Sequence, residues 1–149
     1  MKFHHIGTQF LFLSRHVRRD IQTAVAFLAT RVKTPDEDEC GKLRRCLSYL
    51  QGTKYMKLTS EAKDLRVIEW WVDTSYNMHS NFKGHSGDMM SLGEGATTSA
   101  GNKQKIIVTS SKEDEIVGAR NFLGRIMWSN YFNKSQSYTV DQNIVYQDN

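Results

Sequence analysis

The chain has 149 residues, of which 39% are hydrophobic and 24% charged, a composition typical of a globular protein with one or two domains. No apolar run is long enough for a membrane span, and the first residues lack the charged, apolar and small-residue order of a signal peptide. We therefore expect an intracellular protein without a membrane partner.

The net charge of +4 is unevenly distributed along the chain. Residues 1–54 contain ten Lys or Arg against five Asp or Glu, whereas the remaining residues contain ten against eleven. A local basic surplus favours contact with a phosphate backbone, and a solvated helix surface explains it about as well.

The cysteines and histidines do not form a recognisable metal or disulfide pattern. Cys40 and Cys46 lie six residues apart in a stretch with helical periodicity, which suits neither a zinc pair nor a disulfide framework. The five histidines show no ligand spacing together with cysteine. We expect two reduced thiols and no histidine metal site.

The first third of the chain has helical patterns. Residues 2–13 predict a short helix, and Asp20 is expected to cap a second one that runs to about Val32. The second helix has apolar residues on one face, namely Ile21, Ala24, Val25, Leu28 and Val32. Residues 37–50 predict a third helix with an acidic start. Its apolar positions are expected to pack on the preceding helix, and they are Leu43, Cys46, Leu47 and Leu50.

Strand patterns begin after this helical region. Residues 55–59 alternate enough to predict a strand, and a polar link follows, so we place a domain boundary near residue 60. Residues 67–74 predict a strand that is apolar on both faces and therefore central in its sheet. The two-residue period puts Asp73 on the face of Val67 and Trp71.

The next segments predict an antiparallel meander. Residues 87–92 and a strand that starts at Ala96 are separated by a tight turn at residues 93–95. Residues 143–147 predict a further strand, and the helix expected before it suggests a right-handed crossover that places this strand parallel to that of Asp73.

Residues 112–132 predict that helix, capped by Ser110 or Ser111. Its expected apolar stripe is Ile116, Ala119, Leu123, Ile126 and Met127. The first turn carries Glu113, Asp114 and Glu115, which the helix dipole favours without any further role. A helical wheel points Asp114 away from the stripe and does not choose between the two glutamates.

Acidic residues at the ends of separate elements predict a cation site if the fold brings them together. Asp73, an acid of the 113–115 turn, and Asp148 are placed in this way. Carboxylates within about 4 Å repel by roughly 4 kcal/mol per pair at an effective dielectric constant near 20. Hard divalent cations such as Mg²⁺ relieve this repulsion, and two of them can promote phosphodiester cleavage.

Several short motifs occur in an order and spacing that make a specific signal. They are Trp71-Val72-Asp73-Thr74-Ser75-Tyr76, Gly84-His85-Ser86-Gly87, Lys103-Gln104-Lys105, Ser110-Ser111-x-Glu113-x-Glu115-x-Val117-Gly118 and Tyr146-Gln147-Asp148-Asn149. Together they resemble the start of the ribonuclease H domain of copia-type retrotransposons. The family commonly has Thr and Ala at the positions of Lys112 and Asp114.

The first part of the chain resembles the C-terminal end of the reverse transcriptase of the same family. The matching residues are Leu13-Ser14-Arg15, Arg19-Asp20-Ile21, Ala24-Val25, Arg31, Pro35 and Leu43-Arg44-Arg45-x-Leu47-x-Tyr49-Leu50-x-Gly52-Thr53. The family often has proline at the position of Arg19 and tryptophan at that of Cys40. The catalytic aspartates of the polymerase are not in this chain, so we expect no DNA synthesis.

The resemblance implies an α/β fold with a short helical segment at residues 1–60 and a partial ribonuclease H-like mixed sheet at 61–149. It implies cleavage of RNA in RNA–DNA hybrids with two Mg²⁺ ions held by Asp73, Glu115 and Asp148. Lys103 and Lys105 are expected either to contact phosphate or simply to be solvated.

We expect the chain to be a fragment of a Pol polyprotein, with little nuclease activity as it stands. The alternative is a non-catalytic remnant that binds nucleic acid through its basic helices or has no selected function.

Overall fold

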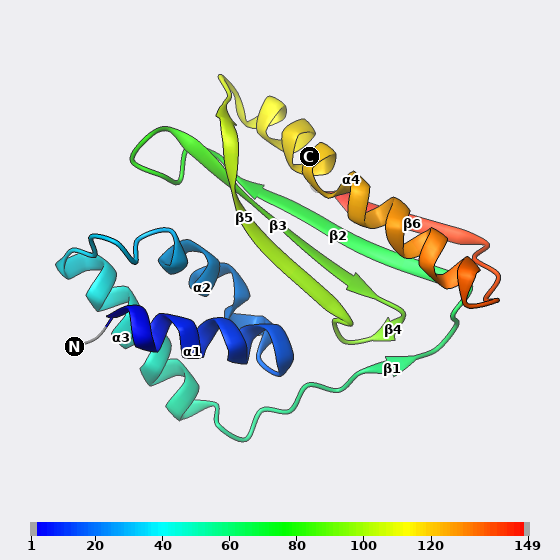
Figure 1. Cartoon of the computed structure of the whole chain (residues 1–149), viewed down its shortest axis with the longest axis horizontal. Coiled ribbons are helices and arrows are strands. Elements are labelled where there is room, and N and C mark those ends of the chain that lie inside the picture. The colour runs from blue at the N-terminus through cyan, green and yellow to red at the C-terminus, as the bar shows by residue number, and fades with distance from the viewer. Residues whose placement is uncertain (1–2, 148–149) are drawn as a thin grey trace. The chain divides into compact units, whose positions relative to one another are not determined.

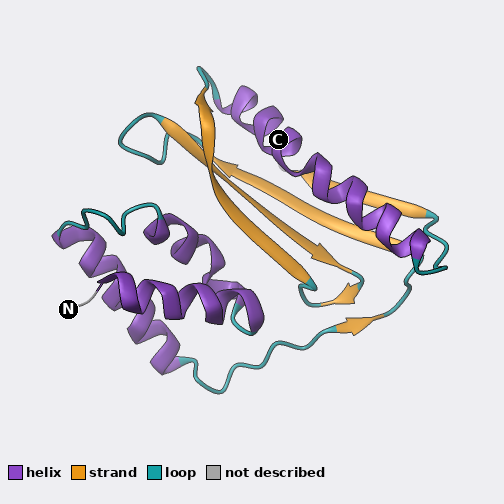
Figure 2. Cartoon of the chain, in the orientation of Figure 1, coloured by secondary structure: helices purple, strands orange, loops and turns teal. Residues whose placement is uncertain are grey.

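A computed structural model describes residues 3–147 of the chain. The chain divides into two compact units, Met1–Leu58 and Thr59–Asn149. The first is helical, and the second combines strands with one long helix, as Figure 2 shows. The predicted α/β class is confirmed. Within residues 3–147, no helix is both long and apolar enough to cross a membrane.

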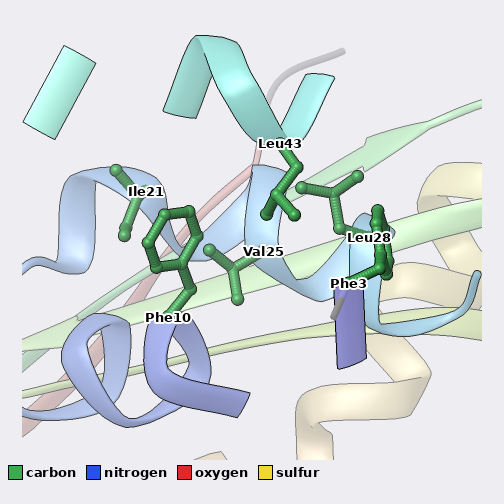
Figure 3. Close-up of a cluster of buried hydrophobic side chains, with 6 residues drawn as sticks. All are labelled: Phe3, Phe10, Ile21, Val25, Leu28 and Leu43. Carbon is green, nitrogen blue, oxygen red and sulfur yellow. The ribbon is translucent and has the colours of Figure 1, made fainter. Parts of the chain in front are cut away.

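The first unit contains helices α1 (Phe3–His16), α2 (Gln22–Ala29) and α3 (Glu37–Gly52). A capping box begins α3, because the Asp36 carboxylate accepts a bond from the Glu39 N–H (2.9 Å) and the Glu39 carboxylate accepts one from the Asp36 N–H (3.0 Å). Six buried apolar side chains from all three helices and the turn before α2 form the core drawn in Figure 3, namely Phe3, Phe10, Ile21, Val25, Leu28 and Leu43.

The start of α2 differs from the prediction. Asp20 does not cap the helix, since it lies in a 3₁₀ turn (Arg19–Ile21) and its carboxylate binds the Arg18 guanidinium at 2.7 and 2.9 Å. The same guanidinium donates to the carbonyl and hydroxyl oxygens of Thr53. The Asp20 carboxylate thus binds the Arg18 guanidinium instead of the N–H groups at the start of α2. Through its bonds to Asp20 and Thr53, Arg18 connects the start of α2 to the end of α3.

The main sheet of the second unit has the strand order β5-β3-β2-β6. Strands β2 (Val67–Ser75), β3 (Lys83–Ser91) and β5 (Thr98–Ile107) form the predicted antiparallel meander. Strand β6 (Gln142–Gln147) pairs with β2 in parallel, so β2 is central, as its sequence predicts. Figure 1 shows the long helix α4 (Ser111–Ser135) beside β2 and β6.

The connection between the helical unit and β2 also differs from the prediction. Residues 55–59 form no strand and are largely exposed, because no neighbouring strand offers them hydrogen bonds. A two-residue strand, β1 (Glu61–Ala62), instead pairs with β4 (Gly93–Glu94). Gly93 has a φ of +154°, and an added Cβ there would lie 2.5 Å from the Glu61 carbonyl oxygen. Only glycine fits this close approach.

Helix α4 covers one face of the sheet with a different stripe from the one predicted. Asp114, Gly118, Phe122, Ile126 and Ser129 are buried, whereas three of the predicted residues are exposed, namely Ile116, Leu123 and Met127. The core beneath the helix consists of Ile68, Trp70, Val72, Met90, Phe122 and Ile126. This face of α4 is the buried one because its small residues allow the helix to approach β2. A Cβ on Gly118 would lie 2.2 Å from Thr74 Cγ2.

Candidate active site

Asp73 lies near the C-terminal end of β2, on the face opposite α4. Ile68, Trp70 and Val72 are buried in the core that α4 shares, so the alternation of the strand turns Asp73 outward. Its side chain is exposed, and its Oδ1 accepts a hydrogen bond from the N–H of Thr74 (2.8 Å). The carboxylate is therefore oriented by its own backbone and accessible to solvent.

Glu115 lies in the first turns of α4, which begins where the Ser110 hydroxyl accepts a bond from the Glu113 N–H. Its Oε1 accepts a hydrogen bond from the Thr74 hydroxyl (2.7 Å), and its Oε2 accepts one from the Gln147 amide (3.1 Å). The same amide donates to the Glu115 carbonyl oxygen (2.8 Å). Glu115 is thus held against β2 and β6 together.

The parallel pairing of β2 with β6 places Val72 opposite Gln147. This pairing is the arrangement that the predicted crossover requires. Asp148, the third predicted acid, lies outside the described residues. Asp73 and Glu115 are therefore brought to the same end of β2, with Thr74 adjacent to one and bonded to the other.

The two carboxylates suit a hard divalent cation in their chemistry. Both present oxygen atoms, the ligands that Mg²⁺ prefers, and carboxylate oxygens have more lone pairs than the observed hydrogen bonds use. Asp73 and Thr74 project from opposite faces of β2, so Asp73 and the Glu115 carboxylate bonded to Thr74 approach this end of the strand from opposite sides. Within residues 3–147, no three His, Cys, Asp or Glu side chains gather closely enough to hold a metal.

Asp114 is a buried acid, whereas the helical wheel placed it away from the predicted buried stripe of α4. Its side chain is fully buried, and neither carboxylate oxygen has a hydrogen-bond partner within residues 3–147. An added Cβ on Gly84 would lie only 2.3 Å from its Oδ1, so the site is tightly packed. Burial raises the pKa of Asp114, and the neighbouring negative charge of Glu115 adds to the rise, although nearby Thr74 and Gln104 oppose it.

Gln104 forms the other side of this polar cluster. Its amide donates to the Ser86 hydroxyl (2.9 Å) and to the Asp114 carbonyl oxygen (3.4 Å), and its own Oε1 has no hydrogen-bond partner among the described residues. The carboxylate oxygens of Asp114 and the amide oxygen of Gln104 are thus buried acceptors without a donor among the described residues.

His79 and His85 form a second buried polar contact, between the loop after β2 and strand β3. Their Nε2 and Nδ1 atoms lie 3.2 Å apart. Burial lowers the pKa of His85, and the positive charge of Lys103 lowers it further. The contact between the two imidazoles joins the loop to β3.

The two predicted phosphate contacts, Lys103 and Lys105, lie on β5. Strand register places Lys103 beside His85 on the face of Asp73, and the register of β5 against β3 is irregular between Lys103 and Ile107, where Lys105 lies. The Lys105 side chain is exposed, and its carbonyl oxygen accepts a bond from Lys83 Nζ (2.6 Å). Their contact with phosphate stays a prediction.

A hollow of about 600 Å³ lies on the other face, between α4 and the sheet. Trp70, Trp128 and Phe132 are among its mainly apolar lining residues. Arg125 also lines it and forms an ion pair with the buried Asp88, and it donates to the Thr98 hydroxyl (3.0 Å). Neither Asp73 nor Glu115 lines this hollow.

Comparison with known proteins returned no match of any kind: no family model, no curated protein and no solved structure is similar to this chain.

Proposed function

We propose that residues 59–149 form a ribonuclease H-like unit of a copia-type Pol polyprotein, which acts on the RNA strand of RNA–DNA hybrids inside the cell. The observation that carries the proposal is the position of Glu115, which binds Thr74 of β2 and Gln147 of β6. These contacts hold an acid of α4 beside the strand of Asp73, and the strand that leads to Asp148 lies parallel to it.

The residues have separate roles in this proposal. Asp73 and Glu115 would hold divalent cations, with Asp148 as the further ligand that the resemblance implies. When bound, such ions supply an activated water and stabilise the leaving oxygen of the phosphodiester. The Thr74 hydroxyl and the Gln147 amide donate to Glu115, which fixes the direction in which its remaining lone pairs point.

The rival function is nucleic-acid binding by the basic helices without catalysis. The basic surplus of residues 1–54, ten Lys or Arg against five Asp or Glu, supports this rival, although four of the basic side chains are paired with acids. The pairs are Arg18–Asp20, Arg31–Glu39, Lys42–Asp38 and Arg44–Glu37.

Cleavage of a labelled RNA–DNA hybrid in Mg²⁺ tests the proposal. Because we expect little cleavage by the 149-residue chain alone, the assay compares it with a version extended with the downstream family segment. In the extended version we expect Asp73→Asn to reduce cleavage by more than about 100-fold, since loss of outer-shell partners of metal ligands alone costs about 10- to 100-fold.

Glu94→Gln is the matched control, because it also removes one exposed carboxylate of the unit, on β4, where Glu94 pairs with Lys63. Its cleavage rate should equal that of the wild type. Absence of Mg²⁺-dependent cleavage in both versions, with hybrid binding retained, would favour the non-catalytic alternative.

A further inference from the structure

Two glycines on neighbouring strands lie beside Asp73 in the sheet. Strand register places Gly87 of β3 beside Asp73, and Gly101 of β5 beside Gly87. An added Cβ on Gly87 would have only the Ala100 carbonyl oxygen near it, at 3.8 Å. On the face opposite α4, the sheet therefore has a flat floor next to the Asp73 carboxylate.

Two stacked aromatic side chains border this flat surface. Trp71 and Tyr146 are neighbours in register, and their rings stack with centroids 5.3 Å apart and an interplanar angle of 23°. Trp71 is 37% exposed and Tyr146 43% exposed. The Tyr146 hydroxyl donates to Glu69 (3.1 Å), which holds its ring in place. Two large rings are thus ordered at the surface.

The spacing of these features suits a polynucleotide strand. Residues two apart on a strand are separated by about 6.7 Å, which is twice the 3.4 Å rise of stacked bases. A base on the Trp71 ring would bring the backbone one or two nucleotides away to Asp73. Lys103 lies on the same face, further along β5 beyond Gly101, where phosphates would follow.

We infer that this face is a subsite for single-stranded nucleic acid, in which a base stacks on the face of the Trp71 ring that Tyr146 leaves open and the backbone crosses Gly87 and Gly101 toward Lys103. The choice of nucleic acid as occupant rests on the proposed function. Aromatic rings beside a basic groove bind single strands with little sequence preference, because every base has a π-face. Asp73 would then meet the phosphodiester next to the stacked base.

Binding is measured with the 149-residue chain in EDTA, so that cleavage does not interfere. The probe is a fluorescein-labelled twelve-nucleotide uridine strand, followed by anisotropy. Trp71→Ala should weaken binding about 5- to 150-fold, which corresponds to the ~1–3 kcal/mol of one base–aromatic stack. Trp128→Ala removes an exposed indole from α4 on the other face and should leave the affinity unchanged.

Two further variants separate stacking from a folding defect. Trp71→Phe keeps an aromatic ring and should retain most of the affinity, whereas Gly87→Val raises a side chain from the floor and should weaken binding. In a Trp128→Phe background, Trp71 is the exposed indole because Trp70 is 1% exposed. The uridine strand should quench its emission.

Equal affinities for Trp71→Ala and Trp128→Ala, or unquenched Trp71 emission, would overturn the inference. So would a concentration-dependent dimer that Trp71→Ala abolishes, since a second copy would then occupy the face. Quenching without cleavage would refute the proposed nuclease alone, and cleavage indifferent to Trp71 would refute the subsite alone.

Discussion

Replacing Asp114 with alanine should stabilise the second unit at neutral pH. The wild-type carboxyl is fully buried and both its oxygens lack hydrogen-bond partners among the described residues. An unsatisfied buried polar group costs about 1–3 kcal/mol, and a charged one costs more. The small void left by the change costs about 1 kcal/mol. We therefore expect Asp114→Ala to raise the free energy of unfolding by about 1–2 kcal/mol at pH 7.

The pH dependence follows from the direction of the pKa shift. Burial raises the pKa of Asp114 in the folded protein above the unfolded value of about 3.9. The folded state then binds more protons than the unfolded state, so wild-type stability falls as pH rises from about 4 through the folded-state pKa. The slope for this one group is at most about 1.4 kcal/mol per pH unit. The advantage of Asp114→Ala should therefore widen over this range.

Urea unfolding at pH 4 to 8 measures the difference. All three tryptophans, at positions 70, 71 and 128, lie in the second unit, so their fluorescence reports its unfolding. Asp114→Asn keeps the shape of the side chain without its charge and should share the flatter pH profile. A wild type that is more stable than both variants at pH 7, or a difference that does not change with pH, would refute the reasoning.

Two predictions concern the cores of the units. Leu43→Ala should lower the free energy of unfolding of the helical unit by about 2–5 kcal/mol, measured by far-UV circular dichroism in urea, because Leu43 is fully buried. Arg125→Met should lower that of the second unit by about 3–5 kcal/mol, since it leaves the buried Asp88 unpaired, and adding Asp88→Asn should recover most of the loss in tryptophan-monitored urea titrations.

Strand patterns in the sequence were informative where a strand is buried. The apolar faces of residues 67–74 predicted a central strand, because the period of two assigns Ile68, Trp70 and Val72 to one face whatever lies on it. Residues 55–59 carry a similar alternation and form no strand. Alternation describes a single segment, whereas a strand also needs a neighbour to satisfy its backbone groups.

The buried face of α4 could not be predicted from hydrophobicity. Large apolar residues lie all around this helix, and Leu123, Trp128 and Tyr131 are exposed. Close approach to Thr74 selected the face of Gly118, which turned Asp114 inward as well. Helical periodicity of large apolar residues does not indicate which face has the small residues that allow close packing. The prediction was therefore wrong for the buried face of α4 and for the burial of Asp114.

The same choice of face determines where Glu115 points. Because Gly118 lets α4 approach β2, the first turn of the helix lies within hydrogen-bond reach of Thr74, and Glu115 binds its hydroxyl. Gln147 completes the contact only when β6 is paired with β2, and the paired residues of these strands lie 75 positions apart in the chain. Pairings between distant segments form slowly because loop closure must come first. The orientation of Glu115 therefore depends on the completed sheet, and the flat floor beside Asp73 depends on the same sheet through Gly87 and Gly101.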